Sequence, residues 1–300
     1  MNPLGERYAV SLYFTGSVSV ILWASAFVGI RAALRSYSPG ELALVRFFVA
    51  SMALVGYGGY VRMPLPLARD LPGIILLGVT GVTIYNLALN YGEVRVTAGI
   101  ASFIVGTVPI WTGLISRFLL QESIGLARWM GTAVSMFGLT VIALTESVGL
   151  RPSLEVLAIL VAAVSQALFF VLQRPLLTRY TPLQLTTYCI AAGTIPLGFV
   201  AGDAAVAVSS AALADTLAVV YLGVFPGAAA YLAWAYVLSR IPPGRAARFL
   251  YCVPPVAMLL GWVWLDEIPT ATSILGGVLA IGGVVIGLAK WEEKRNPRSS

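Results

Sequence analysis

The stretch VPIWTGLISRFLLQE at residues 108–122 returns in altered form as VPPVAMLLGWVWLDE at residues 253–267. In each stretch a proline follows the leading valine, and a glutamate stands 13 residues after that proline. Pro109 therefore matches Pro254, and Glu122 matches Glu267, at a common offset of 145 residues. Residue types that apolar helices tolerate poorly recur in one order, which indicates an internal duplication.

The duplication extends beyond these two stretches. At the offset of 145, five further matches are Ala88 with Ala233, Tyr91 with Tyr236, Gly99 with Gly244, Gly131 with Gly276 and Gly138 with Gly283. Earlier in each half the offset is 143, and the matches are Phe27 with Phe170, Arg31 with Arg174, Tyr37 with Tyr180, and Ser38-Pro39 with Thr181-Pro182. Matches of Pro, Glu, Arg and Tyr in one order are hard to obtain by chance in this composition.

The composition predicts a membrane protein. Hydrophobic residues make up 59% of the 300 residues and charged residues only 11%, against about 25% charged residues in ordinary globular domains. Apolar stretches long enough to cross a bilayer occur at about 12–33, 40–60, 71–91, 96–119, 125–146, 154–173, 183–201, 214–238, 245–265 and 270–289. We therefore predict an all-α polytopic membrane protein with ten transmembrane helices. A signal-peptide reading of Ala24-Ser25-Ala26 is disfavoured, because the apolar stretch continues past these residues.

The basic residues predict the orientation. With the N-terminus inside, fourteen Lys and Arg side chains lie on the inner side and five on the outer side, as the positive-inside rule requires. Asp203, Asp215, Asp266, Glu93 and Glu146 then fall on the outer side. We predict that both termini are cytoplasmic.

Two units of five helices each must enter the membrane from opposite sides, because five is odd. We expect a first repeat at residues 8–148, an inverted second repeat at 153–290, and a cytoplasmic tail at 291–300. Inverted repeats are a recurrent architecture of secondary transporters, in which exchange of conformation between the halves opens a central site to each side in turn.

Residues that enzymes and metal sites require are scarce. The chain has no histidine, so His-dependent zinc motifs and a Ser-His-Asp triad are excluded. A phosphate-binding GxxxxGK[ST] motif is also absent. Cys189 and Cys252 lie in separate apolar stretches without metal-binding spacing. We expect no catalytic residues, no metal and no cofactor.

Polar and aromatic residues at membrane depth predict a substrate cavity. Unpaired amides are costly in lipid, so their helix faces should point inward. The cavity candidates are Trp23, Thr83, Asn86, Asn90, Ser102, Gln166, Phe170, Tyr231, Trp234 and Tyr251. Interhelical hydrogen bonding is the alternative role for each of them. A lining of aromatic walls and neutral amides suits a substrate with an apolar body and a zwitterionic head group. Because no carboxylate is predicted near the bilayer centre, we expect a facilitator or exchanger without obligate proton coupling through Asp or Glu.

Other candidates are structural or gating residues. Pro109 and Pro254 are expected to bend their helices. Glu122 and Glu267 are expected near opposite interfaces, either ending a helix or acting in a gate. Arg46, which is near Glu41 in sequence, and Arg248 are expected in structural ion pairs, with capture of a substrate carboxylate as the alternative. The small residues Gly131, Gly138, Gly276, Ala280, Gly283 and Gly287 permit close helix packing, within one chain or between two.

Several segments resemble a known family. ILWASAFVGIRAAL (21–34), SPGELALVRFFVA (38–50) and the run from Leu89 to Leu139 resemble the EamA branch of the drug/metabolite transporter superfamily, and residues 235–284 repeat the pattern more loosely. Within this family the chain is most similar to the YddG-type exporters of aromatic amino acids. The second half departs from the first, with Cys189 opposite Arg46 and Arg248 opposite Phe103, which puts a symmetric role of these positions in doubt.

The resemblance implies ten helices around a cavity built from the first, third, fourth, sixth, eighth and ninth. It also implies a multi-pass protein of the bacterial cytoplasmic membrane whose partners are a small-molecule substrate, above all an amino acid, and membrane lipids. A nucleic-acid partner is not expected. The duplication makes a monomer sufficient, and a homodimer remains open. Two alternatives remain: a broad-specificity exporter of drugs or nucleotide sugars, and a channel or membrane scaffold.

Overall fold

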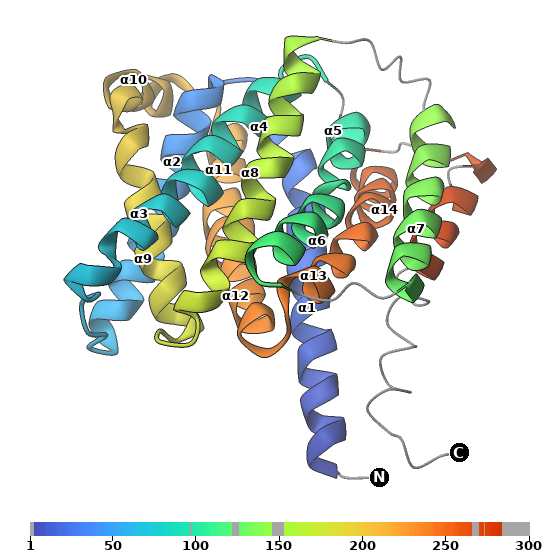
Figure 1. Cartoon of the computed structure of the whole chain (residues 1–300). Helices are drawn as coiled ribbons and strands as arrows, with labels where there is room; N and C mark the ends of the chain where they lie inside the picture. Colours follow the sequence, from blue (N-terminus) through green and yellow to red (C-terminus); the bar gives the residue numbers. More distant parts are fainter. Residues whose placement is uncertain are drawn as a thin grey trace.

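The structure, a computed structural model, describes residues 3–96, 98–121, 126–145, 153–265, 270–272 and 274–283. These residues form helices and short connections, and no strand occurs among them. Seven helical spans in this part of the chain are long and apolar enough to cross a membrane. The predicted class of all-α polytopic membrane protein is confirmed, and Figure 1 shows its packed helices.

The helices of the first half follow the predicted apolar stretches. Their bounds are α1 Pro3–Ala33, α2 Pro39–Tyr60, η1 Ala68–Asp70, α3 Leu71–Gly78, η2 Val79–Ile84, α4 Tyr85–Glu93, α5 Ala98–Val105, α6 Val108–Leu119 and α7 Leu126–Thr145. The stretch predicted at 96–119 is divided into α5 and α6, which Gly106 and Thr107 separate. The stretch predicted at 71–91 extends to Glu93 at the end of α4.

The second half repeats this order. Its elements are α8 Leu154–Leu176, α9 Pro182–Thr194, η3 Ile195–Val200, α10 Ala201–Ser210, α11 Leu213–Leu222, η4 Gly223–Ala229, α12 Ala230–Arg240, α13 Pro243–Ala246, η5 Ala247–Cys252 and α14 Val253–Leu265. A further apolar helix covers Ile274–Gly283. The span Pro182–Ser210 is longer than the predicted stretch 183–201.

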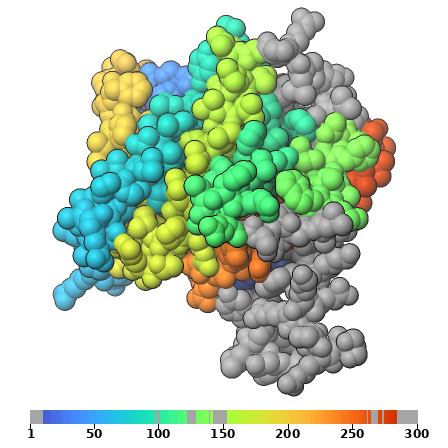
Figure 2. Space-filling view, viewed as in Figure 1, coloured from blue at the N-terminus to red at the C-terminus, as the bar shows by residue number. Residues whose placement is uncertain are grey.

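The two halves run in opposite directions. In Figure 1, α1 rises from the end marked N, whereas α8 begins at the opposite end of the molecule. Equivalent contacts cross between the halves: α4 packs on α8, and its counterpart α12 packs on α1. In the space-filling view, first-half α3 and α6 lie on either side of second-half α8 (Figure 2). The halves therefore interlock instead of forming separate lobes.

Both halves interrupt their third long span with a π-helical segment. In η2 the carbonyls of Thr80 and Gly81 accept side-chain hydrogen bonds from Ser165 Oγ at 2.8 Å and Tyr231 Oη at 2.9 Å. In η4, Pro226 has no backbone N–H to donate. Irregular helix of this kind is tolerated within a membrane where neighbouring helices satisfy the freed backbone groups.

Small residues bring α7 and the helix Ile274–Gly283 into close contact within one chain. A Cβ atom built on Gly138 would lie 2.4 Å from the carbonyl oxygen of Gly276. One built on Gly283 would lie 2.3 Å from Ser135 Oγ, which itself donates to the carbonyl of Ala280 at 2.8 Å. These glycines therefore serve intramolecular packing, and Gly287 lies outside the described residues.

Polar contacts tie the halves together at both ends. At one end, Asp70 accepts hydrogen bonds from Arg179 Nη1 at 2.7 Å and Tyr180 Oη at 2.8 Å. At the other end, Asp215 accepts one from Ser36 Oγ at 2.5 Å, and the hydroxyls of Tyr37 and Thr216 are 2.8 Å apart. The offsets of the duplication relate the two sets, since Ser36, Tyr37 and Asp70 match Arg179, Tyr180 and Asp215. We call them the inner latch and the outer latch, after the predicted orientation.

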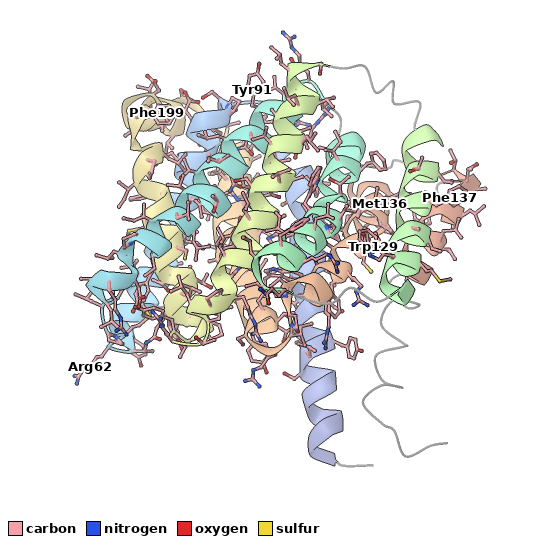
Figure 3. The ribbon with its side chains drawn as sticks, viewed as in Figure 1. Arg62, Tyr91, Trp129, Met136, Phe137 and Phe199 are labelled. Carbon is pink, nitrogen blue, oxygen red and sulfur yellow. The ribbon has the colours of Figure 1, made fainter. Side chains whose placement is uncertain are left out.

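Apolar side chains cover much of the periphery. Phe137 on α7 is 63% exposed and Phe199 in η3 is 71% exposed, and both lie at the outer edges of the molecule in Figure 3. Arg62, directly after α2, lies at one end of the molecule in the same view. An apolar belt with charges at its ends is the surface that a bilayer requires.

Candidate functional site

A small cavity lies where the two halves meet. Helices of both halves form its walls: α1, α2, α4, α5 and α6 from the first half, and α8, η5 and α14 from the second. The lining residues are Trp23, Ala26, Phe27, Ile30, Arg46, Tyr85, Leu89, Val105, Gly106, Val108, Gln166, Phe170, Leu250 and Val253. Its volume is about 30 Å³, room for about one water molecule. The cavity is therefore narrow in this structure, since pockets for small organic ligands have volumes of roughly 300 Å³ or more.

The duplication relates residues that the first half contributes to the cavity lining to residues that the second half contributes. At the offset of 143, Trp23 matches Gln166 and Phe27 matches Phe170; at the offset of 145, Val105 matches Leu250 and Val108 matches Val253. Each half thus contributes equivalent positions to the same space. A site shared in this way by inverted repeats can be opened from either side by equivalent motions of the two halves.

Two interrupted helices form part of the wall. Val105, Gly106 and Val108 surround the break between α5 and α6, while Leu250 and Val253 surround the junction of η5 with α14. Pro109 and Pro254 each occupy the second residue of the helix that follows the break, where a missing N–H costs little. Pro109 thus follows a gap between two helices and Pro254 follows a change from 3₁₀ to α-helix, and irregular backbone of this kind is tolerated in a membrane protein where it lines a cavity.

Aromatic rings close the space beside Trp23. The ring of Trp23 lies 5.9 Å from Phe170, 5.3 Å from Trp234 and 5.7 Å from Tyr231 between ring centroids. Phe170 and Trp234 are 4.9 Å apart. Because these four rings come from α1, α8 and α12, rearrangement of the helices would open an apolar wall for a substrate side chain.

Arg46 is the charged residue of the cavity wall. It is 2% exposed, and its Nη1 donates to Asn86 Oδ1 at 3.2 Å. Its guanidinium carbon lies 5.1 Å from the ring centroid of Phe47, a cation–π distance. Its Nε has no hydrogen-bond acceptor among the described residues. A buried guanidinium with an unused donor is well suited to bind an anionic group.

The predicted amides have mainly structural partners. Asn86 Nδ2 donates to the carbonyl of Val82 at 2.8 Å, and its oxygen serves Arg46. Asn90 Nδ2 donates to the carbonyl of Pro39 at 3.1 Å. Thr83 Oγ1 donates to the carbonyl of Gly193 at 2.7 Å. Gln166 does line the cavity, and its Oε1 has no donor among the described residues.

The other predicted residues lie apart from the cavity lining. Tyr251 is 1% exposed and packs with Ala280, beside Phe103 and Met136, and Ser102 is 3% exposed. Glu41 Oε2 accepts from the backbone N–H of Ser38 at 2.7 Å in a capping box at the start of α2, so it serves helix capping and not an ion pair with Arg46. Arg248 is 4% exposed in η5. Glu122 and Glu267 lie outside the described residues.

Sequence reasoning did not single out Tyr85 or Glu93 as site residues. Tyr85 lines the cavity. Glu93, expected as an outer charge, is 1% exposed, and neither carboxylate oxygen has a hydrogen-bond donor among the described residues. One signal was available: Tyr85, Leu89 and Glu93 recur at intervals of four residues, which places them on one helix face.

Comparison with known proteins agrees with this architecture. The sequence pattern of the EamA-like transporter family matches residues 10–144 and again residues 153–288. The transporter YdfC of Bacillus subtilis (strain 168) is 38% identical over 279 residues, which cover 93% of this chain and 91% of YdfC. A crystal structure of a protein with 19% sequence identity superposes with a TM-score of 0.75, covering 97% of this chain and 99% of that one.

Two further relatives carry informative names. A protein of Streptantibioticus cattleyicolor named "Probable terminal-alkyne amino-acid exporter" is 38% identical over 269 residues, covering 90% of each chain. The inner membrane transporter YedA of Escherichia coli (strain K12) is 28% identical over 275 residues, covering 90% of this chain and 89% of YedA. With the apolar spans described above, these matches identify a small-molecule transporter that crosses the bacterial cytoplasmic membrane several times. The chain belongs to the EamA-like transporter family.

Proposed function

We propose that the protein exports amino acids with apolar or aromatic side chains by alternating access. The observation that carries this proposal is the cavity between the two halves, whose wall contains the aromatic rings of Trp23 and Phe170 together with Arg46. Aromatic rings accommodate an apolar side chain, and a guanidinium binds a carboxylate. The relative named as an amino-acid exporter supports this substrate class.

Alternating access follows from the paired walls. Equivalent helix breaks in the two halves meet the same cavity. Opening one side and closing the other requires the halves to exchange conformations, which equivalent units in opposite orientations can do. We propose that the protein works as a facilitator or exchanger, with the direction of net flux set by the substrate gradients. A monomer contains the complete cavity, so a homodimer is not required for transport.

The test is substrate flux in proteoliposomes. Purified protein is reconstituted and loaded with one unlabelled amino acid at a time, and uptake of labelled phenylalanine, leucine, alanine and glutamate is measured. We expect saturable uptake of phenylalanine and leucine, stimulated by the same amino acid inside. Uptake that stays linear with concentration and is indifferent to internal substrate would indicate a channel. Protein-free liposomes and liposomes with heat-denatured protein are the controls.

The alternative substrate classes are tested in the same vesicles. Nucleotide sugars carry phosphates, which call for several cationic groups, whereas among the described residues that line the cavity only Arg46 is charged. We therefore expect no counterflow of a labelled nucleotide sugar. Counterflow of nucleotide sugars without counterflow of any amino acid would overturn the proposal.

A further inference from the structure

Three buried side chains, two of them in the cavity lining, have polar atoms without a hydrogen-bond partner among the described residues. Arg46 Nε has no acceptor, while Gln166 Oε1 and both carboxylate oxygens of Glu93 have no donor among the described residues. Arg46 is 2% exposed, Gln166 4% and Glu93 1%. Leaving such groups unsatisfied costs free energy in any protein interior, and most of all for a charge. These groups therefore suggest a ligand that supplies both an anion and a cation.

Arg46 and Glu93 are placed to act together. Arg46 lines the cavity, as do Tyr85 and Leu89 of α4. Glu93 is on the same face of α4, one helical turn beyond Leu89. Arg46 interacts electrostatically with Glu93. The ion pairs found within 4.0 Å in the described part of the chain are Arg95 with Glu155 and Arg179 with Asp70. Arg46 and Glu93 are thus a basic and an acidic side chain within electrostatic range of each other that form no ion pair.

The other charges around Glu93 already have partners. Arg31, on α1, also interacts electrostatically with Glu93, and its Nη1 donates to the carbonyl of Val96 at 3.4 Å. Arg95 and Glu155, in the connection after α4 and at the start of α8, pair with each other at 3.2 Å. No positively charged side chain in the described structure donates a hydrogen bond to the carboxylate of Glu93.

We infer that Arg46 and Glu93 form a recognition pair for the zwitterionic head group of the substrate. The substrate carboxylate binds the guanidinium of Arg46, the ammonium binds the carboxylate of Glu93, and the apolar body lies against the rings of Trp23 and Phe170. This inference rests on the proposed transport of amino acids and specifies how they are recognised. It assigns the head group to Arg46 and Glu93, because both amide groups of Asn86 and the amide nitrogen of Asn90 already have partners elsewhere.

The narrow cavity must widen before the pair can act. Its volume of about 30 Å³ is far below that of an amino acid, so the helix face with Leu89 and Glu93 has to separate from α2. Arg46 and Glu93 come from different helices, α2 and α4. A head group that bridges these helices would therefore bind one conformation better than another, as coupling of binding to movement requires.

The test is competition in proteoliposomes that contain the full-length protein. Uptake of labelled phenylalanine is measured against unlabelled phenylalanine, 3-phenylpropanoate, which lacks the ammonium, and 2-phenylethylamine, which lacks the carboxylate. For the wild type we expect phenylalanine to compete at concentrations about tenfold lower than either analogue, the weight of one charge-assisted hydrogen bond. In Glu93→Gln the advantage over 3-phenylpropanoate disappears. In Arg46→Gln the advantage over 2-phenylethylamine disappears.

Glu155→Gln is the matched control. Glu155 is an acidic residue near the same end of the molecule that pairs with Arg95, so its removal should leave both concentration ratios unchanged. The inference is overturned if, in Glu93→Gln, phenylalanine still competes at concentrations about tenfold lower than 3-phenylpropanoate, as expected for the wild type. If, in addition, phenylalanine uptake by this variant no longer responds to an imposed pH gradient, Glu93 binds a proton and not the substrate.

The wild-type protein alone supplies a second test that does not depend on variants that fold. Thermal unfolding in detergent is measured with each of the three compounds. Phenylalanine should raise the midpoint, and the two analogues at equal concentration should have little effect. Equal stabilisation by 3-phenylpropanoate would overturn the inference. If the wild type transports neither phenylalanine nor any other amino acid, the proposed function itself fails. If the wild type transports amino acids and Glu93→Gln keeps the wild-type ratios of competing concentrations, only the recognition pair fails.

Discussion

At the scale of single residues, the environment of Arg46 decides how the site works. A guanidinium with an exposure of 2% is costly to bury unless its N–H groups are satisfied. Asn86 accepts one of them and is itself fixed by its bond to Val82. Phe47 lies against the guanidinium. Arg46 is therefore held in place on one side while its Nε remains available on the other.

Replacement of Asn86 by Ala removes the acceptor for Arg46. We expect normal membrane insertion and an apparent affinity for the substrate lowered about tenfold, as for one hydrogen bond to a charged group. Saturation of labelled phenylalanine uptake measures the change. Asn86→Asp keeps an acceptor oxygen and should retain more affinity than Asn86→Ala. Wild-type saturation in Asn86→Ala would show that Arg46 does not need this support.

Trp234 contributes its rings more than its N–H. It is 1% exposed, its Nε1 has no acceptor among the described residues, and it contacts Trp23 and Phe170. We expect Trp234→Phe to keep most transport, because an aromatic ring still fills the space. Trp234→Ala leaves a large void and should lose most transport while still inserting. Initial uptake rates, normalised to the reconstituted protein, measure both; equal rates in the two variants would contradict this view.

At the scale of elements, close contacts between helices position the wall. Gly78 at the end of α3 meets Gly193 of α9, and its counterpart Gly223 at the start of η4 meets α2. In the first contact a Cβ on Gly78 would lie 2.5 Å from the backbone nitrogen of Gly193. Small residues at these crossings let backbones approach closely. Each π-helical span thus packs on the second long helix of the other half.

Gly223→Ala should disturb the helix that carries Arg46. The added Cβ would lie 2.6 Å from the carbonyl oxygen of Arg46 and 2.8 Å from Val49 Cβ. Overpacking of this kind costs about 1–3 kcal/mol, so we expect a lower unfolding temperature in detergent and weaker transport. Gly56→Ala is the matched control, because Gly56 is also helical and a Cβ there meets nothing within 4 Å. An equal effect of both substitutions would contradict the assignment.

At the scale of the whole molecule, the duplication relates two latches at opposite ends. The inner latch contains an ion pair in which Asp70 is buried and Arg179 is half exposed, with a further hydrogen bond from Tyr180. The outer latch has hydroxyl groups where the inner latch has the arginine. Because Asp70 pairs with an oppositely charged guanidinium, whereas Asp215 accepts from a neutral hydroxyl, the inner latch has an added Coulombic attraction and should hold its side closed more firmly.

Removal of each latch should shift the conformational equilibrium in opposite directions. A cysteine is introduced as Val105→Cys in the cavity wall, with Cys189→Ala and Cys252→Ala, and its reaction with a membrane-impermeant thiol reagent is followed from each side. We expect Asp70→Asn to increase modification from the cytoplasmic side about fivefold, which corresponds to roughly 1 kcal/mol. Asp215→Asn should increase it from the outer side, and by less. Increases on the same side for both variants would contradict the inverted latches.

Much of the architecture was predictable because it depends on local features of the sequence. Apolar length determines which segments cross the bilayer, and the recurrence of Pro109 as Pro254 reveals the duplication. Several cavity residues were also predictable, since Trp23, Gln166 and Phe170 do line the space. The offset of 143 relates Trp23 to Gln166 and Phe27 to Phe170, so each half contributes equivalent positions to the cavity.

The sequence by itself thus determined the class, the duplication and the aromatic character of the centre. The tertiary structure decided which polar groups remain available. Both amide groups of Asn86 and the amide nitrogen of Asn90 are used in hydrogen bonds, whereas both carboxyl oxygens of Glu93 are buried without a donor among the described residues. The reason is that hydrogen-bond partners lie far apart in the chain, as Tyr231 and Gly81 do. Apolar length and residue spacing are local properties, but the satisfaction of a buried charge depends on every helix that surrounds it.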